Sequence, residues 1–490
     1  MKTKIKAQYV IGYQGNDHVI FENGELVYED DRVIYVGHHY PGDVDQSMDA
    51  GKALVSPGFI DINALADIDT TIMTYDQPSS LGLGNRWSDK YFNQGPKEVF
   101  SPEEETFKSR YALTQLIYNG ITTAFPVTSL SYRAWGETKP EFEAIVDVAK
   151  DLGLRVYLGP SYRSAVNLVE QNGTLTQYWD EERGMNGLHD AVEFIEEFDG
   201  QNQGLIKGLL VPSTIETCSN KLLTQTKKSA DEYEVPIRLH AAQSARDFNL
   251  TKERFGMTPI KYLNSIGFLG PRTIIPHATY VDGYSQAEPS KRLDVEILRD
   301  TETIVVHCPF VLARSGSALD SFEKYKNLGI RIVMGTDCYP SDMLMNLRLG
   351  SVMCRMVEHT KDVASTADLF RAATIWPADS LGRPDLGRLA AGSKADFFIF
   401  DLSEMHIAQI DGPIRTMILN GQNTDFKTVV INGKIVMQDR QIPGVDVDQF
   451  STQSQTLFDK LKESYSQRDY RNRPQNELFP ENFMIKKDHR

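Results

Sequence analysis

Eight short apolar runs recur through the middle of the chain, and this repetition constrains the fold more than any other feature. The runs are rich in β-branched residues, and stretches with a helical pattern, such as residues 142–153, separate them. Parallel strands with helical crossovers give this pattern, and eight is the number that closes a (β/α)8 barrel. The sequence therefore predicts an α/β fold with a TIM-like (β/α)8 barrel over residues 57–389. The eight expected strands cover residues 59–60, 120–125, 154–159, 208–211, 236–240, 273–277, 303–307 and 330–335.

The two ends of the chain are rich in short strand-like runs. Asn23-Gly24 separates two such runs near the N-terminus, which is a strong hairpin signal. Similar runs return at residues 395–400 and 428–436. Residues 1–56 and 390–445 are therefore expected to form a small composite β-sandwich. For the polar segment 446–490 two interpretations stay open: a tail packed on the barrel or on a partner subunit, or a disordered tail.

Composition limits the partners and the location. The 490 residues include 52 basic and 67 acidic side chains, a net charge of −15. Nucleic acid and anionic membrane surfaces favour Lys/Arg patches, so neither is expected as a partner. No apolar run approaches the ~18 residues of a membrane span, and no signal peptide is expected. The cysteines lack C-x-x-C spacing and are read as reduced thiols of a cytoplasmic protein; they are Cys218, Cys308, Cys338 and Cys354.

Polar residues stand where the expected strands end. Asp61, His240, His277, His307 and Asp337 each close an apolar run or follow it directly. Active sites of such barrels are built at the carboxyl ends of the strands. A single histidine there is more often structural, but five titratable groups on one rim predict a functional site.

Several segments in order along the chain carry a family resemblance. They include Ser-Pro-Gly-Phe-Ile-Asp at 56–61, Leu-His-Ala-Ala-Gln at 239–243, Val-His-Cys-Pro at 306–309, Met-Gly-Thr-Asp at 334–337 and Gly-Ser-Lys-Ala-Asp at 392–396. The chain resembles the amidohydrolase superfamily, in the branch with cytosine and guanine deaminases and atrazine-type chlorohydrolases. The resemblance implies a barrel with a composite β-sandwich, a small-molecule substrate and a homodimer.

The resemblance also implies a metal site, in which the first pair of ligands is replaced. The family holds its metal with a His-x-His after the first strand, a histidine after the fifth and an aspartate after the eighth. His240 and Asp337 match the last two, whereas the His-x-His positions fall on Asn63 and Leu65. His277 matches a histidine that assists the reaction. The glutamate that shuttles protons in the family is Gln243 here, and an amide cannot titrate.

The expected catalytic residues are therefore His240, His277, Asp337 and Gln243. His240, His277 and Asp337 are also the expected ligands of one divalent metal (Zn, Fe or Mn), with Asn63 as a weak carbonyl ligand. In the metal-free alternative, the histidines act as acid and base beside Asp337.

Asp67 and Asp69 are alternative oxygen ligands for a harder ion, or residues that cap the long loop after the first strand. Cys338 is either a nucleophile or, more in keeping with its setting, a buried inert thiol.

Further residues are predicted to contact the substrate, each beside a structural alternative. Tyr162 and Arg163 follow the third strand, where an Arg side chain can hold an oxyanion or form a rim ion pair. Trp87 lies in the long loop and can stack on a flat ring or meet a partner subunit. His307 either contacts the substrate or holds its own turn. The predicted substrate-binding residues are Asn63, Tyr162, Arg163, His307 and Trp87.

These features predict a hydrolase that acts on a non-peptide C–N bond, or a ring substituent, of a small cyclic nitrogen compound. The replaced residues Asn63, Leu65 and Gln243 keep two alternatives open. One is a metal-free, non-catalytic protein that binds a small molecule. The other is a metal-independent lyase or isomerase.

Overall fold

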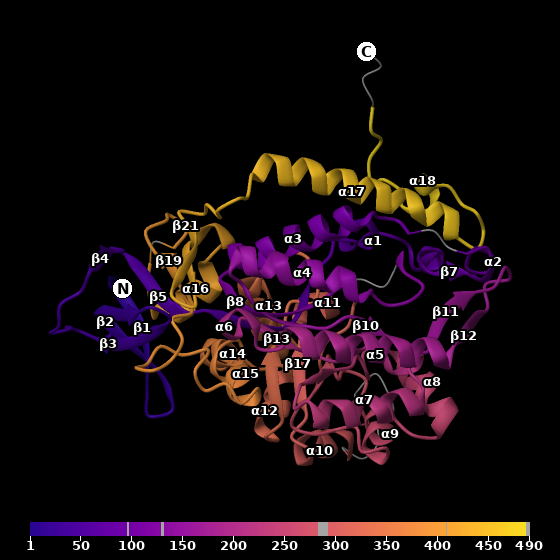
Figure 1. Ribbon diagram of the computed structural model, residues 1–490, viewed down its shortest axis with the longest axis horizontal. Helices are drawn as coiled ribbons and strands as arrows, with labels where there is room; N and C mark the ends of the chain where they lie inside the picture. The colour runs from indigo at the N-terminus through magenta and orange to yellow at the C-terminus, as the bar shows by residue number, and fades with distance from the viewer. Residues whose placement is uncertain (96–97, 129–131, 283–292, 408, 487–490) are drawn as a thin grey trace.

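Segments from both ends of the chain form one β-sheet. The computed structural model describes residues 1–95, 98–128, 132–282, 293–407 and 409–486. In its largest sheet the strand order is β21-β20-β19-β5-β1-β2-β3, with β4 paired to β1, so the C-terminal strands continue the N-terminal ones where β19 pairs with β5 (Figure 1). The strands are β1 (Lys2–Gln14), β2 (Asp17–Glu29), β3 (Arg32–Gly37), β4 (Gln46–Asp49), β5 (Ala53–Pro57), β19 (Phe397–Asp401), β20 (Phe426–Ile431) and β21 (Lys434–Gln438).

The middle of the chain forms two parallel four-stranded sheets, with orders β13-β9-β8-β6 and β15-β16-β17-β18. Seven of the eight apolar runs overlap one of these strands, which confirms those strand predictions. The fourth run, 208–211, meets its strand only at residue 208, where β13 ends. The first sheet consists of β6 (Phe59–Leu65), β8 (Ile121–Val127), β9 (Arg155–Leu158) and β13 (Ile206–Gly208). The second consists of β15 (Ile237–Arg238), β16 (Thr273–Pro276), β17 (Ile304–His307) and β18 (Arg331–Met334).

Backbone contacts join the two parallel sheets on both sides. A bridge pairs Leu210, just after β13, with Ile237 of β15. On the other side, the backbone N–H of Asp337 donates to the carbonyl of Asn63 at 2.7 Å. The carboxyl ends of β6 and β18 are therefore held next to one another.

The proline–glycine entry to β6 has a steric reason. A Cβ atom on Gly58 would lie 2.1 Å from Oγ1 of Thr122, so only glycine allows the chain to pass this close to β8. Gly58 also donates its N–H to the carbonyl of Asp396, which links the start of β6 to the terminal sheet.

Helices connect the strands of the two parallel sheets. The helix predicted at 142–153 is present as α4 (Lys139–Leu152), and it ends at Gly153 in the left-handed conformation. A capping box between Ser101 and Glu104 begins α3. The other connecting helices of eight or more residues are α3 (Pro102–Tyr118), α5 (Glu181–Phe198), α7 (Asn220–Glu232), α8 (Ala245–Phe255), α10 (Leu293–Asp300) and α13 (Met343–Glu358). None of the helices among the described residues has the length and apolar character needed to cross a membrane.

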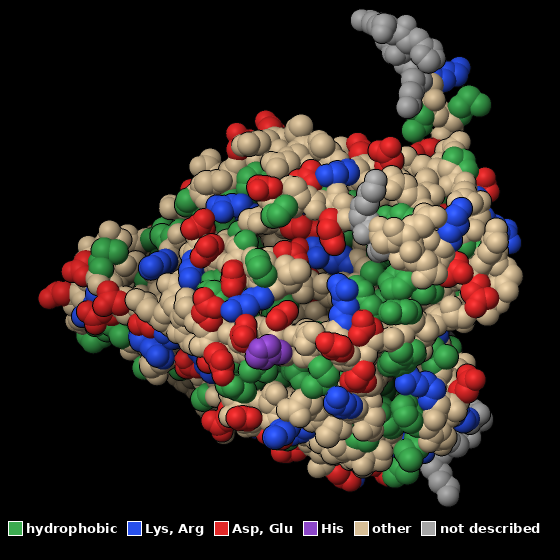
Figure 2. Space-filling model, turned by 45° about the vertical axis from the view of Figure 1, so that its right-hand side comes forward, with side chains coloured by type: hydrophobic (Ala, Val, Ile, Leu, Met, Phe, Trp, Pro, Cys, Tyr) green, Lys and Arg blue, Asp and Glu red, His purple; other side chains and the backbone are tan. Residues whose placement is uncertain are grey.

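Insertions after the first and third strands build a small additional layer. Strands β7 (Trp87–Ser88), β11 (Ala165–Val169) and β12 (Leu175–Trp179) form a separate sheet in the order β12-β11-β7. Figure 2 shows acidic and basic side chains interspersed over the face it presents, with hydrophobic side chains gathered on its right-hand side. Exposed aromatic residues of β12 include Tyr178 and Trp179.

The C-terminal segment contains a long helix that packs on the body of the molecule. Helix α17 (Val447–Arg468) lies across α3 and the short helix α1 (Thr71–Thr74) at the top of Figure 1. Leu457, Leu461 and Tyr465 are buried on it, and Lys460 pairs with Glu104 of α3 at 2.6 Å. A short helix, α18 (Gln475–Leu478), follows. Within the C-terminal segment, the structure therefore shows α17, α18 and Phe479 packed on the same chain.

A buried ion pair joins the terminal sheet to the parallel strands. Arg155, at the start of β9, is fully buried and donates twice to Asp396, at 2.9 Å (Nη2) and 3.1 Å (Nε). Asp396 also accepts the backbone N–H of Asn432, just after β20, at 2.6 Å. Because both charges are out of water, each depends on the other for compensation.

We expect Asp396→Ala to destabilise the protein by roughly 3–5 kcal/mol, because the Arg155 charge would stay buried without its partner. Urea unfolding followed by circular dichroism measures the change. The control Asp147→Ala removes a carboxylate that is 81% exposed on α4 and should stay within about 0.5 kcal/mol of the unaltered protein. Equal effects of the two substitutions would contradict this role of the pair.

Candidate functional site

Three of the predicted catalytic side chains meet at the carboxyl ends of the parallel strands. His240, His277 and Asp337 follow β15, β16 and β18, and one ligand atom from each lies within 4.8 Å of the others. Nε2 of His240 is 3.9 Å from Oδ1 of Asp337, and Nε2 of His277 is 3.4 Å from Oδ2. His277 is fully buried, whereas His240 and Asp337 are 13% and 12% exposed. The cluster is thus largely buried, with His240 and Asp337 partly exposed to solvent.

The backbone at this cluster is strained. His277 has φ 69° and Asp337 has φ 58°, and Ala242, two residues after His240, has φ 54°. Non-glycine residues in the left-handed region cost on the order of 1–3 kcal/mol each and persist only where surrounding contacts impose them. Here those contacts are the hydrogen bonds from the N–H groups of His277 to Val306 and of Asp337 to Asn63. The strain turns both side chains into the same small volume.

Asn63 takes part in the cluster through a direct contact with Asp337. Its Nδ2 donates to Oδ1 of Asp337 at 2.7 Å, and its Oδ1 is buried with no hydrogen-bond partner among the described residues. One carboxylate oxygen is therefore fixed by a neutral donor, and the other faces His277. The nearby side chain at position 65 is a leucine, which offers no ligand atom.

Asp61 hydrogen-bonds to Asn63 and Thr336, the residues next to the cluster. It is fully buried and accepts the N–H of Asn63 at 3.1 Å and the hydroxyl of Thr336 at 2.6 Å. Burial raises the pKa of Asp61 to about 6, against the lowering effect of these donors. Asp61 thus ties β6 to the residues that precede Asp337, which is a positioning role.

The charges of the cluster are strongly coupled. Burial lowers the pKa of His240, although the neighbouring carboxylate of Asp337 acts in the opposite direction. Burial alone would raise the pKa of Asp337, but the two adjacent imidazoles outweigh it and hold that pKa well below its usual range. The cluster therefore presents an ionised carboxylate beside two imidazoles.

These donors fit a divalent metal ion. Two imidazole nitrogens and one carboxylate form a three-ligand set of the kind that catalytic zinc sites use, with a fourth position left for water. The ring of His277 is fully buried, and its Nδ1 has no hydrogen-bond partner among the described residues, while its Nε2 has only the 3.4 Å contact with Asp337. A buried imidazole that is poorly satisfied is costly, and a bond to a metal ion would satisfy one of its nitrogens.

Gln243 lies in the loop between His240 and α8. Its backbone N–H donates to Oδ2 of Asp247 at 3.0 Å. Asp247 begins α8 through a capping box with Ser244, and burial raises the pKa of its carboxyl to about 6. The carboxylate nearest to Gln243 along this loop is thus used in holding the loop, and the side chain at 243 remains a neutral amide.

His307 is buried at the end of β17. His307 is 2% exposed, and burial together with nearby His277 lowers its pKa to about 3. Its ring centroid lies 6.1 Å from that of Phe322 in the apolar surroundings of β17. It is therefore a neutral imidazole, and its contact with substrate stays a prediction.

Tyr162, Arg163 and Trp87 lie in other parts of the structure. The hydroxyl of Tyr162 is buried and 3.0 Å from Oγ1 of Thr226. Arg163 donates to the carbonyl of Arg133 at 2.7 Å, and burial lowers its pKa to about 10. Both line a pocket of about 430 Å³ next to α5.

Trp87 lines a different pocket of about 590 Å³ with Phe92 and Trp135. The substrate contacts of Tyr162, Arg163 and Trp87 stay predictions.

Asp67 belongs to a buried ionic network that the sequence analysis did not foresee. It is fully buried and pairs with Lys108 of α3 at 3.2 Å, and Lys108 pairs with Glu105 at 2.6 Å. Arg133 continues the network by pairing with both Glu105 and Glu141. Since these charges compensate one another, Asp67 holds the loop after β6. A lysine at a buried position of α3, Lys108, is the local sequence signal for such a network.

Asp69 and Cys338 are also resolved by the geometry. Oδ1 of Asp69 accepts the N–H of Thr71 at 2.7 Å and so caps the loop, as the structural alternative expects. Burial raises the pKa of Cys338 to about 12, so this thiol is not an ionised nucleophile near neutral pH.

Comparison with known proteins decides the family. The model of the amidohydrolase family matches residues 54–436, which is most of the chain. The chain belongs to the amidohydrolase family. The matched region contains every residue of the cluster and strands β19 and β20 of the terminal sheet, whereas β1, β2, β3 and β4 lie before it.

Relatives with a named activity are deaminases. The chain is 25% identical over 446 residues to 5'-deoxyadenosine deaminase of Methanosarcina acetivorans, covering 90% of this chain and 94% of the relative. It is 26% identical over 447 residues to 5-methylthioadenosine/S-adenosylhomocysteine deaminase of Thermococcus onnurineus, with 90% and 95% covered.

Among solved structures, atrazine chlorohydrolase of Arthrobacter aurescens, complexed with zinc, has a TM-score of 0.77 at 20% identity. The match covers 93% of this chain and 99% of that chain. These matches confirm the predicted family and branch, and with them a hydrolase that acts on C–N bonds other than peptide bonds.

If Asn63 positions Asp337, Asn63→Ala should lower the affinity for a divalent metal by roughly 10–100-fold, the usual effect of losing a residue that orients a ligand. Competition with a chromophoric chelator at increasing zinc concentrations measures this affinity. Asn119 offers a matched control, because it is also a buried asparagine but hydrogen-bonds within α3. Unchanged zinc affinity in Asn63→Ala would show that the contact does not support the ligand.

Proposed function

We propose that the protein hydrolyses the C–N bond of an amino substituent on a small nitrogen-containing ring. Water adds to the ring carbon, and the amine leaves as ammonia. The observation that carries the proposal is the convergence of His240, His277 and Asp337 at the carboxyl ends of the strands, on a strained backbone. We further infer that the two parallel sheets form the closed barrel expected from the sequence. The bridge between Leu210 and Ile237 joins them on one side, and the hydrogen bond from Asp337 N–H to the carbonyl of Asn63 joins them on the other.

In this proposal His240, His277 and Asp337 hold one divalent metal. Such an ion, when bound, supplies a Lewis acid and makes a water molecule acidic enough to react near neutral pH. Asp337 keeps its charge because the two imidazoles stabilise it, and Asn63 fixes one of its oxygens. His240, the more exposed histidine, faces the side from which a substrate approaches.

Gln243 limits how fast such a site works. Its amide can orient a ring nitrogen or a water molecule by hydrogen bonding, but it cannot carry a proton from water to the leaving amine. We therefore propose a slow hydrolase, in which bulk water delivers that proton. The homodimer and the cytoplasmic location belong to the same proposal and rest on the family resemblance and composition.

The replaced residues Asn63, Leu65 and Gln243 support a second candidate, a family member that binds a small molecule without converting it. It predicts saturable binding of ring compounds with no product formed. The metal-independent lyase or isomerase also remains an alternative, and it predicts a product that contains no oxygen from the solvent.

The decisive test combines metal analysis with a screen for ammonia release. Protein loaded with zinc, iron or manganese is assayed on adenosine-type nucleosides, cytosine, guanine and aminotriazines, and products formed in ¹⁸O-labelled water are weighed by mass spectrometry. We expect turnover of at least one compound with incorporation of ¹⁸O. His240→Ala and Asp337→Ala should each lose the metal and more than about 100-fold of the activity.

Gln243→Glu adds the missing proton carrier and should raise kcat for ammonia release by at least about tenfold. Asn119→Ala serves as the control with unchanged activity. Equal activity in His240→Ala, Asp337→Ala and the unaltered protein would refute the proposal. Saturable binding without product for every metal would favour the non-catalytic candidate, and product without ¹⁸O the lyase or isomerase.

A further inference from the structure

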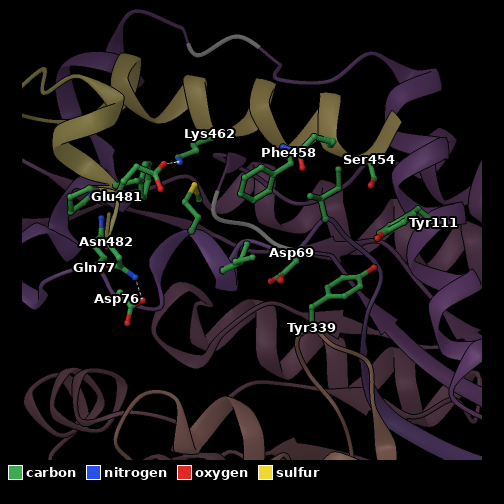
Figure 3. A pocket seen from close by; sticks show the side chains of 16 residues that line it. Asp69, Asp76, Gln77, Tyr111, Tyr339, Ser454, Phe458, Lys462, Glu481 and Asn482 are labelled. Carbon is green, nitrogen blue, oxygen red and sulfur yellow. Dashed lines mark hydrogen bonds and ion pairs between the residues drawn. The ribbon is translucent and has the colours of Figure 1, made fainter. Parts of the chain in front are cut away.

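A pocket of about 420 Å³ opens between the loop after β6, the residues that follow Asp337, and helix α17. Figure 3 shows side chains from all three segments converging on it. Asp69 and Tyr339 form the side next to the strands, and Ser454, Phe458 and Lys462 of α17 form the opposite side. The C-terminal helix is thus one wall of a cavity that would otherwise be open to solvent.

Aromatic rings line this pocket. The rings of Tyr111 and Tyr339 are 6.3 Å apart at an interplanar angle of 23°, and the ring of Phe458 lies on the α17 side (Figure 3). Tyr339 is 8% exposed, and its hydroxyl is buried without a hydrogen-bond partner among the described residues. In Figure 3 that hydroxyl points toward the hydroxyl of Tyr111 at the edge of the cavity. A buried hydroxyl without a partner on a pocket wall indicates a polar ligand there.

The charges in the pocket are unequal. Lys462 lies 3.6 Å from Glu481, so the pocket's one basic side chain in the described lining is already paired. Oδ2 of Asp76 accepts from Asn482 at 2.7 Å. Asp69 accepts one backbone N–H but forms no ion pair within the described residues. Asp69 and Asp76 thus both lack an ion pair among the described residues, and Asp69 is the one that lies beside the aromatic faces (Figure 3).

From this combination we infer that the pocket is a binding site for a small organic cation with an apolar body, such as an arylalkyl ammonium. Aromatic faces attract cations, and a carboxylate adds a charge-assisted hydrogen bond to an ammonium group. Asp69 receives the ammonium group, the rings of Tyr111, Tyr339 and Phe458 surround the carbon skeleton, and the hydroxyl of Tyr339 gains a partner. Binding of a cation in this pocket is independent of the proposed reaction, because it requires neither a bound metal nor catalytic turnover.

Its place in the chain also gives the site a consequence. Tyr339 is two residues from Asp337, and Asp69 is on the loop that begins after Asn63. An occupied pocket therefore fixes the two segments that flank the cluster of His240, His277 and Asp337.

The test uses benzylamine, which is an ammonium ion at neutral pH, and benzyl alcohol, a neutral molecule of nearly the same size. Isothermal titration calorimetry on the full-length protein should show one saturable site for benzylamine, with binding at least about tenfold tighter than that of benzyl alcohol. Asp69→Asn should remove this preference. Asp147→Asn is the matched control, because its carboxylate is 81% exposed on α4 and lies outside the pocket lining, and it should change binding less than about twofold.

A second variant guards against misfolding as the cause. Phe458→Leu keeps an apolar side chain on α17 but removes the ring that packs on the carbon skeleton, so it should weaken the binding of benzylamine and of benzyl alcohol severalfold and leave the preference for benzylamine unchanged. Asp337→Ala should retain benzylamine binding even though it abolishes the proposed reaction. Equal affinities for the two probes would overturn the inference, as would an unchanged preference in Asp69→Asn, or an equal loss of the preference in Asp147→Asn.

Discussion

The contact between Asn63 and Asp337 joins the first and last parallel strands at the point where the chemistry is expected. The backbone carbonyl of Asn63 accepts from Asp337 N–H at 2.7 Å, and its side chain donates to the carboxylate at the same distance. A histidine in place of Asn63 would offer a nitrogen lone pair to a metal, whereas the amide N–H group of Asn63 donates a hydrogen bond to Asp337. Asn63 thus occupies the position of a family metal ligand and at the same time orients Asp337, a ligand that is retained. The strained backbone at His277 and Asp337 persists because neighbouring residues form contacts of this kind.

The cluster is supported at a distance by buried charges that are compensated in pairs. Arg155 and Asp396 attach the terminal sheet to β9, and Lys108 with Asp67 fixes the loop after β6. Buried pairs of this kind contribute little net stability, but removing one partner is costly, so they define one arrangement of the elements they join. Helix α17 packs on α3 and forms one wall of the pocket that Asp69 lines.

Local patterns predicted the strands and the polar residues at their ends, because period, β-branching and strand termini are written in neighbouring residues. Convergence of His240, His277 and Asp337 followed from the parallel order alone. The positions of Tyr162, Arg163 and Trp87 did not follow, since loop conformation decides whether a side chain after a strand faces the rim, the core or another pocket. Lys108 and Asp67 are 41 positions apart in the sequence (108 − 67), and a pattern in neighbouring residues does not reveal a pairing over that distance. In the C-terminal segment, Leu457, Leu461 and Tyr465 recur at helical spacing, so this helix was visible in principle.

The central claim is that two histidines and one aspartate, without the family's first pair of ligands, hold a metal at this site. X-ray absorption spectroscopy at the zinc edge, on protein loaded with one equivalent of zinc, tests it most directly. The account predicts a shell of nitrogen and oxygen atoms with the outer-ring scattering of two imidazoles, reduced to one in His277→Ala. Sulfur in the first shell would contradict it by assigning the zinc to a cysteine such as Cys308 or Cys338, as would a zinc ion bound only by water.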